Sequence, residues 1–206
     1  MAKDVNKYLV ARRPWLADEA VTELRKLVTT DTRVFEWGSG GSTLFFLDQG
    51  AQVVSVEHHA DWSKKVAEFV VAGDDGTHMA RAALHCIAPN AKAPSGSDPC
   101  NYLKCTSSDK REYRAYCEHI LQYAPDSFDL VLVDGRARPA CVWLAVPRVV
   151  PGGIIVLDDY QRTRYQPVQQ ALRTLEWEAT HLFPEHGDVG KGRRVAFWRK
   201  PTKGGT

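Results

Sequence analysis

Hydrophobic and polar positions follow two alternating patterns along the chain, one typical of buried strands and the other of amphipathic helices. Short apolar runs that predict strands lie at 34–37, 52–57, 83–88, 129–133 and 153–157. Stretches with apolar residues at helical spacing lie at about 14–30, 42–49, 61–71, 110–123, 139–149 and 167–175. Two further runs, 179–183 and 194–198, predict strands joined by a Gly-rich, charged connection. Strands that alternate with helices form right-handed parallel crossovers, so we expect an α/β fold with a mostly parallel sheet and an antiparallel C-terminal hairpin.

A single domain accounts for this pattern. The 206 residues, 44% of them hydrophobic, suffice for one continuous core at about 33–200, preceded by the helix at 14–30. The segment 89–109 is rich in Pro, Ser, Gly and Asn and predicts a long loop. Loops of that length in compact domains are usually functional or mobile. The tail at 201–206 is expected to be disordered.

Charge and hydropathy narrow the classes of partner. The net charge of +2 is too small to indicate a nucleic-acid partner. No apolar run approaches the roughly 20 residues of a membrane span, and the first residues lack the apolar core of a signal peptide. We therefore expect a cytoplasmic protein without a membrane or nucleic-acid partner.

The first predicted strand leads into a glycine-rich turn and then a helix. Gly38, Gly40 and Gly41 let the backbone turn sharply and approach a ligand, and Ser42 can cap the helix that follows. Glu57 ends the next predicted strand, 19 residues after Gly38. In a Rossmann-like βαβ unit, an acid about 20 residues from the first glycine meets ribose hydroxyls. The segment therefore predicts a site for a nucleotide-type cofactor.

Glu36, two residues before the first glycine, helps to discriminate between cofactors. A dinucleotide places its pyrophosphate at the helix N-terminus, where a nearby carboxylate repels it. S-adenosylmethionine has no phosphate and carries a positive sulfonium and an ammonium. Thr43 also stands where the dinucleotide fingerprint requires Gly or Ala. These residues favour S-adenosylmethionine, and an NAD(P)-binding Rossmann oxidoreductase and a non-catalytic S-adenosylmethionine-binding module remain as alternatives.

Four segments in this order resemble the class I S-adenosylmethionine-dependent methyltransferases: Glu36-x-Gly38-x-Gly40, Glu57, 128–135 with Asp134, and 151–159 with Asp158 and Asp159. The resemblance covers roughly residues 33–200 and implies a Rossmann-like, seven-stranded, mostly parallel sheet with helices on both faces. It also implies that the cofactor lies across the carboxyl ends of the first strands. The predicted cofactor contacts are Glu36, Gly38, Ser39, Gly40, Ser42, Glu57, His58 and Asp134.

Three acids at the ends of the later strands suggest further chemistry. Ligands of open α/β sheets bind beyond the carboxyl ends of the strands, so Asp134, Asp158 and Asp159 are expected on the same rim as the cofactor. The three positions also resemble those that hold a magnesium-like ion in metal-dependent small-molecule O-methyltransferases, although Asp159 stands where that group usually has Asn. The sequence leaves two interpretations open: a divalent cation, or a network with the neighbouring arginines Arg136, Arg138, Arg162 and Arg164.

Methyl transfer requires an aligned nucleophile, exclusion of water and, for a hydroxyl or ammonium acceptor, removal of a proton. Asp134 and Asp158 are the candidate bases. Tyr160, Arg162, Arg164 and Tyr165 follow the acid pair and are predicted to line the acceptor pocket. The guanidinium groups of the two arginines favour an anionic acceptor. The alternative interpretation is that these residues form a solvated, charged loop. We therefore expect methyl transfer to an oxygen or nitrogen of a small molecule.

The remaining candidates are a helix, the cysteines and the histidines. The N-terminal helix with Trp15 is a candidate lid or homodimer contact. His58, His59 and His186 are candidate bases, although such residues are more often surface or capping groups. The five cysteines include Cys100 and Cys105, whose spacing allows a disulfide or a zinc site. A reducing compartment favours free thiols for all five.

Overall fold

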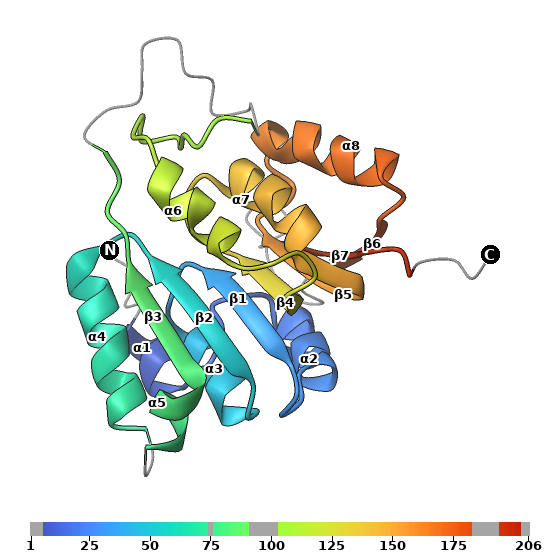
Figure 1. The fold of residues 1–206 in the computed structure, drawn as a ribbon. Coiled ribbons are helices and arrows are strands. Elements are labelled where there is room, and N and C mark those ends of the chain that lie inside the picture. The colour runs from blue at the N-terminus through green and yellow to red at the C-terminus, as the bar shows by residue number, and fades with distance from the viewer. Residues whose placement is uncertain (1–5, 74–75, 91–102, 183–193, 203–206) are drawn as a thin grey trace.

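The computed structural model describes residues 6–73, 76–90, 103–182 and 194–202. His186, Cys100, most of the predicted loop at 89–109 and the end of the predicted disordered tail lie outside the described residues. Seven strands form one sheet in the order β3-β2-β1-β4-β5-β7-β6 (Figure 1). The strands are β1 (Arg33–Trp37), β2 (Gln52–Glu57), β3 (Ala82–Cys86), β4 (Phe128–Val133), β5 (Val149–Asp158), β6 (Glu178–Leu182) and β7 (Val195–Arg199).

Four neighbouring strand pairs, β1 with β2, β1 with β4, β2 with β3 and β4 with β5, are parallel. The final strand β7 runs antiparallel to both β5 and β6. The predicted seven-stranded, mostly parallel sheet with an antiparallel C-terminal hairpin is therefore confirmed. Reversal of the strand order between β1 and β4 creates the point at which such sheets bind ligands, beyond the carboxyl ends of the strands.

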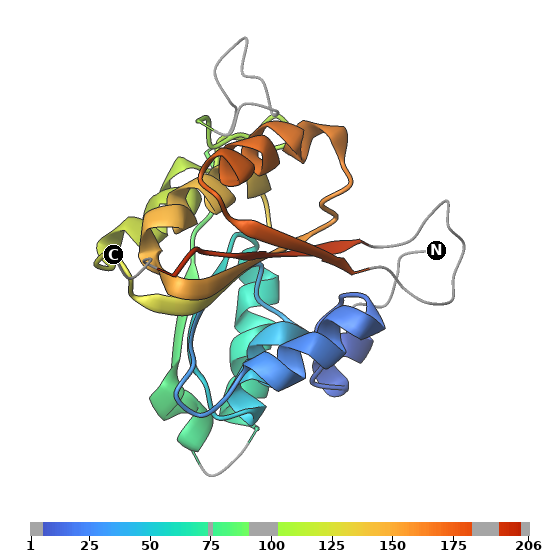
Figure 2. The same ribbon diagram turned by 90° about the vertical axis from the view of Figure 1, so that its right-hand side faces the viewer.

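Helices cover both faces of the sheet, as Figure 2 shows from the side. They are α1 (Asn6–Val10), α2 (Asp18–Leu27), α3 (Gly41–Asp48), α4 (Ala60–Val71), α5 (Thr77–Arg81), α6 (Arg114–Glu118), α7 (Arg138–Ala145) and α8 (Gln166–Thr174). Successive side chains of a strand point to opposite faces. Val34 of β1 accordingly belongs to the core that α1, α2, α3 and α4 cover, and Phe35 belongs to the core that α6, α7 and α8 cover. Leu130 and Val131 of β4 divide in the same way, so two hydrophobic cores share one sheet.

The predicted helices are longer than the observed ones at three places. The segment 14–30 is helical only at Asp18–Leu27, and the segment 110–123 contains α6 followed by a 3-10 turn at His119–Gln122. Helix α7 gives way to a 3-10 turn at Val146–Arg148, where Pro147 has no backbone N–H for a helical hydrogen bond. Helices α1 and α5 were not predicted. Within the described residues, no helix has both the length and the apolar composition needed to cross a membrane.

Close backbone contacts join β1 to its two neighbours at the carboxyl end of the sheet. The Gly38 N–H donates to the Val56 carbonyl at 2.9 Å, and the Asp134 N–H donates to the Trp37 carbonyl at 3.0 Å. Gly38 has φ +97°, and a Cβ at this position would lie 2.9 Å from the Gly135 nitrogen. Glycine is therefore required here both for the backbone conformation and for the close approach of β1 to β4.

Candidate functional site

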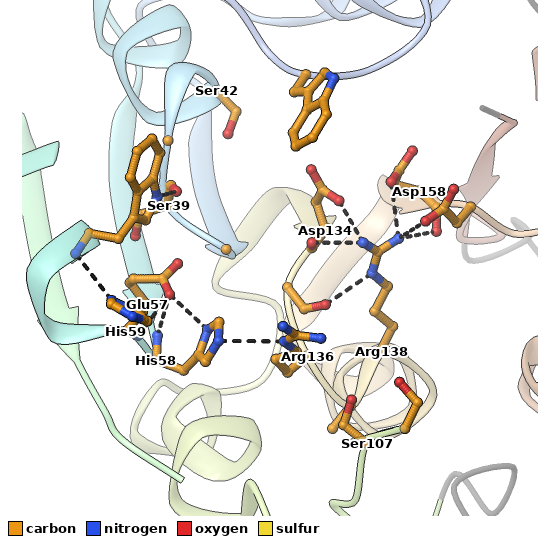
Figure 3. A pocket seen from close by; sticks show the side chains of 18 of the residues that line it. Ser39, Ser42, Glu57, His58, His59, Ser107, Asp134, Arg136, Arg138 and Asp158 are labelled. Atoms are coloured by element: carbon orange, nitrogen blue, oxygen red, sulfur yellow. Dashed lines mark hydrogen bonds and ion pairs between the residues drawn. The ribbon is translucent and has the colours of Figure 1, made fainter. Parts of the chain in front are cut away.

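A cavity of about 680 Å³ opens at the carboxyl ends of β1, β2, β4 and β5. The lining includes the glycine turn, the end of β2, Trp62 of α4 and the ends of β4 and β5. Figure 3 shows Ser39 and Glu57 on one side of the cavity and Asp134 and Asp158 on the other. Tyr8 and Trp15, whose rings stack at 5.2 Å between centroids, come from the N-terminal segment to the same cavity. The fold thus brings segments from most of the chain to one site.

The glycine turn presents open backbone to the cavity. A Cβ placed on Gly40 would have one near neighbour, Trp62 Cζ2 at 3.8 Å, so a side chain at this position would project into open space. A Cβ on Gly41 would instead lie 2.1 Å from the Arg13 carbonyl oxygen, because the N-terminal segment packs directly on the start of α3. The Trp62 indole N–H donates to the Ser39 carbonyl at 2.7 Å and fixes the far side of the turn.

Glu36 lies behind this turn and not in the cavity lining. Its side chain is fully buried, and the Ser42 and Ser55 hydroxyls donate to it at 2.7 and 2.8 Å, together with the Thr43 hydroxyl. Burial raises the pKa of Glu36 to about 7, against the lowering effect of these three hydroxyls. Glu36 was predicted to contact the cofactor, but the structure uses it to join β1, β2 and α3 beneath the turn.

Glu57 ends β2 and faces the cavity. Its Oε1 atom accepts the backbone N–H groups of His58 and His59, both at 2.8 Å, and lies 2.7 Å from His58 Nδ1. Within the described part of the chain, none of these contacts uses Oε2, which leaves one carboxylate oxygen for a ligand. The Arg136 Nε–H donates to His58 Nε2 at 3.4 Å and continues this chain of polar contacts toward β4 (Figure 3).

On the opposite wall, the guanidinium of Arg138 lies between the three acids of β4 and β5. Its Nη2 donates to Asp134 Oδ1 at 2.8 Å, and its Nη1 donates to Asp158 Oδ2 at 3.0 Å and to Asp159 Oδ2 at 3.3 Å. It also donates to the backbone carbonyls of Asp158, Asp134 and Gly135 at 2.7, 2.9 and 3.0 Å. The side chain of Arg138 is only 11% exposed, so this is a largely buried ion cluster.

The arrangement corrects the predicted metal set of Asp134, Asp158 and Asp159. Across the described ranges, no group of three or more His, Cys, Asp or Glu side chains is arranged to hold a metal ion. A divalent cation needs several oxygens around one point at about 2.0–2.6 Å, and here the guanidinium occupies the space between the carboxylates. The alternative of an arginine network is the one that the structure shows, through Arg138 and through Arg162, which pairs with Asp159.

Asp134 and Asp158 interact across this cluster. Burial, followed by repulsion from Asp158, raises the pKa of Asp134 well above its usual value, while Arg138 opposes the shift. The Asp158 side chain is 5% exposed, and its Oδ1 atom has no hydrogen-bond partner among the residues that the structure describes. Asp159 has a left-handed backbone with φ 55°, a strained conformation that tends to occur at functional sites.

Three of the four predicted acceptor residues, Arg162, Arg164 and Tyr165, line the cavity. The Arg164 guanidinium lies 5.0 Å from the centre of the Tyr165 ring, and its Nη2 donates to the Tyr165 hydroxyl at 3.3 Å. Tyr160 is not in the lining, and its side chain packs against the core beneath α6, α7 and α8. The tyrosine carbonyl accepts the Gln169 amide N–H at 2.7 Å, which ties the backbone to α8.

Several lining residues were missed. Tyr8 and Trp62 carry no local motif, and Ser107 and Ser108 come from the predicted long loop at 89–109, in which no single residue was predicted to reach the site. Of the predicted cofactor contacts, the structure brings Gly38, Ser39, Gly40, Ser42, Glu57, His58 and Asp134 to the cavity, while Glu36 lies behind it. His59 also lies in the lining.

The described cysteines are free thiols. Cys86 is exposed, whereas Cys105, Cys117 and Cys141 are buried. The sulfur atoms of Cys117 and Cys141 lie 3.7 Å apart, beyond the roughly 2.05 Å of a disulfide bond. Cys100, the other member of the predicted Cys100–Cys105 pair, lies outside the described residues, so free thiols for all five cysteines remain a prediction.

Comparison with known proteins places the fold. No protein-family model matches the chain, and no curated protein matches it by sequence. Among solved structures, it is similar to a methyltransferase-like protein from Silicibacter pomeroyi, with a TM-score of 0.58 and 20% identity over 92% of this chain and 89% of that one. A proposed O-methyltransferase from Klebsiella pneumoniae gives a TM-score of 0.58 and 16% identity over 97% and 91%.

A third structure, P. horikoshii TYW2 in complex with MeSAdo, gives a TM-score of 0.53 and 12% identity over 86% of this chain and 60% of that one. At these identities the likeness concerns the fold. The chain therefore has the fold of the class I S-adenosylmethionine-dependent methyltransferases, as the order of its acidic strand ends predicted.

Proposed function

We propose that this protein is an S-adenosylmethionine-dependent methyltransferase that acts on an oxygen or nitrogen of a small molecule with an anionic group. The observation that carries the proposal is one cavity in which Glu57 and the open glycine turn face a carboxylate pair, Asp134 and Asp158. This cavity lies at the reversal of strand order in a methyltransferase fold, where ligands of open α/β sheets bind.

The residues around the glycine turn fit S-adenosylmethionine. Glu57 retains one carboxylate oxygen, Oε2, for ribose hydroxyls, and Gly40 leaves open space along the turn. Glu36 contributes less to this choice than the sequence indicated, because it is buried and its raised pKa means that it is partly protonated near pH 7. The preference over a dinucleotide therefore depends on the fold and on Thr43, which stands where the dinucleotide fingerprint requires Gly or Ala.

When bound, S-adenosylmethionine supplies an electrophilic methyl group on a sulfonium, so the chain has to orient an acceptor, exclude water and hold its proton. Asp158 Oδ1, buried and without a partner among the described side chains, is positioned to accept that proton from a hydroxyl or ammonium group. Arg138 holds the other oxygen of the same carboxylate and thereby orients Asp158. Tyr8, Trp15 and Tyr165 provide apolar surface that limits water in the cavity.

We propose an anionic acceptor because the part of the cavity lining near the acids also carries positive charge. Arg136, Arg162 and Arg164 all line the cavity near the acids. The guanidinium of Arg164 contacts the ring and the hydroxyl of Tyr165 and has further N–H groups for a ligand. Guanidinium groups bind a carboxylate or phosphate well, because two parallel N–H groups match two oxygens. We also propose that the N-terminal segment covers the site, since its residues Tyr8 and Trp15 form part of the cavity lining.

The test is formation of S-adenosylhomocysteine from S-adenosylmethionine across pairs of small acceptors that differ only in a carboxylate or phosphate group. We expect turnover with anionic members of these pairs and a loss of about 10²–10⁴-fold in Asp158→Asn, the usual contribution of a general base. Binding of the cofactor without turnover on any acceptor would favour the non-catalytic alternative and contradict the enzymatic proposal.

A filled-cavity variant provides the matched control for cofactor binding. Gly40→Leu places its side chain in the cavity without backbone strain, because Gly40 has an extended backbone with φ 172° and open space around its Cβ. We expect this variant to fold normally and to lose cofactor binding. Retained affinity for S-adenosylmethionine in Gly40→Leu would contradict the placement of the cofactor along this turn.

A further inference from the structure

The three carboxylates of Asp134, Asp158 and Asp159, here called the acidic rim, need a positive charge to compensate them. Three carboxylates from two neighbouring strands converge within reach of one group, Arg138. Uncompensated carboxylates in a buried site are costly, so proteins pair them with cations or let them take up protons. Among the residues that the structure describes, Arg162 forms an ion pair with Asp159 and none with Asp134 or Asp158.

Arg138 is held in the centre of this rim by more than its charge. An arginine has five N–H donors, and the guanidinium of Arg138 directs them at three carboxylates and three backbone carbonyls. Ala137, which precedes it, has a left-handed backbone with φ 48°, and Arg138 is the first residue of α7. Displacement of the guanidinium by an ion would therefore break its hydrogen bonds to three backbone carbonyl groups and leave an unpaired arginine.

We propose that Arg138 is the resident cation of the acidic rim and takes the place of a divalent metal ion, so that methyl transfer at this site is independent of metal. The guanidinium orients Asp158 through Oδ2 and leaves Oδ1 for the acceptor's proton. The inference about metal rests on the rim geometry alone, and its consequence for turnover rests on the proposed function. Arg138 is thus a positioning residue that acts through Asp158.

The proposal predicts that removal of the guanidinium creates a metal site, because the same three carboxylates are then available as ligands. Arg138→Ala vacates the space between Asp134, Asp158 and Asp159, whose oxygens are the donors that hard divalent cations prefer. Mn²⁺ is a suitable probe, since its free and bound forms are distinguished by electron paramagnetic resonance without any need for turnover. Arg136→Ala is the matched control, because it removes the same charge from an exposed position two residues away.

We expect the wild-type protein to bind no Mn²⁺ up to about 1 mM and Arg138→Ala to bind one ion at least about tenfold more tightly than that limit. Arg136→Ala should behave as wild type, and the double variant Arg138→Ala with Asp158→Asn should lose the acquired binding. The Mn²⁺ should also raise the melting temperature of Arg138→Ala and leave that of the wild type unchanged, since an ion that binds only the folded state stabilises it.

Binding of Mn²⁺ to the wild-type protein that Asp158→Asn abolishes would overturn the proposal. A folded Arg138→Ala variant that gains no Mn²⁺ would also overturn it, and circular dichroism establishes whether the variant is folded. If Arg138→Ala does not fold, the wild type and Asp158→Asn still decide between a rim that binds metal and one that does not. In turnover assays, a chelator should change the wild-type rate less than about twofold. Absence of turnover would count against the proposed function alone.

Discussion

Glu36 and the aspartate rim lie at the same edge of the sheet, and their charges are compensated in different ways. Glu36, at the end of β1, is surrounded by three hydroxyl groups, from Ser42, Thr43 and Ser55. The rim of Asp134, Asp158 and Asp159, at the ends of β4 and β5, is compensated mainly by the guanidinium of Arg138. Burial raises the pKa of Glu36 to about 7, because the three hydroxyl groups offset only part of its effect, whereas Arg138 contributes a fixed positive charge to the rim.

The two kinds of compensation correspond to two roles, a structural one for Glu36 and a proposed catalytic one for the aspartate rim. Glu36 is sealed beneath the glycine turn, where it shapes the backbone that lines the cavity. The aspartate rim faces the cavity and retains an unused acceptor atom, Asp158 Oδ1, within the described part of the chain. The position of an acid at the end of a strand is therefore insufficient to assign its role, and the donors around it are decisive.

The largest expected effect comes from removal of the cation in the rim. Arg138→Met keeps most of the side-chain volume but leaves Asp134 and Asp158 without their arginine partner. Removal of one partner from a buried ion pair typically costs about 3–5 kcal/mol. We expect a loss of that size in the free energy of unfolding, measured by urea denaturation. Arg136→Met, at an exposed position, should change it by less than about 0.5 kcal/mol. Equal effects of the two substitutions would contradict the central role of Arg138.

The next largest effect concerns the pH dependence that Glu36 introduces. The folded-state pKa of Glu36 is about 7 against an ordinary value of 4.5, so the folded protein keeps a proton that the unfolded chain releases between these values. Stability contributed by this proton is present at low pH and is lost as the pH rises toward and through 7. Between pH 5 and pH 8 the loss amounts to about 2–3 kcal/mol.

The variant Glu36→Gln lacks a titratable group at this position, so it is the control for the pH dependence of the wild type. Urea denaturation at pH 5 and pH 8 should show that the wild-type stability falls by about 2–3 kcal/mol more than that of Glu36→Gln over the same interval. Parallel pH profiles for the two proteins would show that the carboxyl group is not perturbed by its burial, and the contrast with the aspartate rim would fail.

A smaller effect distinguishes Glu36 from Glu57 in cofactor binding. Glu57→Gln preserves an oxygen for the backbone N–H groups of His58 and His59 but removes the charge that we propose meets the ribose of the cofactor. Hydrogen bonds to charged groups contribute about 1.5–3 kcal/mol, so the dissociation constant for S-adenosylmethionine should rise about 10- to 100-fold. Glu36→Gln should change it less than about threefold, since Glu36 does not line the cavity. The reverse order of the two effects would restore Glu36 as the cofactor contact.

The smallest effect is expected at the opposite edge of the sheet. Arg33 and Asp129 form a bidentate pair at 2.9 and 3.0 Å between β1 and β4, but their side chains are 41% and 35% exposed. Because solvent screens such pairs, Arg33→Met should cost less than about 1 kcal/mol in urea denaturation. A cost as large as that of Arg138→Met would show that burial is not what gives the rim arginine its effect.

These contrasts also explain how far the sequence predicted the structure. The strands were found because β1, β2, β4 and β5 are short apolar runs, and Glu57 was placed at the cavity because an acid at a strand end in this fold has few other positions. The burial of Glu36 was not predicted, since it depends on Ser55, which is distant in sequence and meets it only across the β1–β2 pair.

The same limit applies to the arginines and to the loops. Four arginines lie near the acids in sequence, and no local pattern tells that Arg138, at the start of α7, is the one that turns into the rim. The left-handed backbone of Ala137, a residue without a known preference for that conformation, directs it there. Likewise, Tyr8 and Ser107 reach the cavity through tertiary packing, which the spacing of hydrophobic residues does not encode.

The central claim is that the cavity binds S-adenosylmethionine, and isothermal titration calorimetry of the wild-type protein tests it most directly. We predict binding of one S-adenosylmethionine per chain, weakened in Glu57→Gln, and no binding of NAD at the same concentrations. Heat of binding with NAD and none with S-adenosylmethionine would contradict the claim.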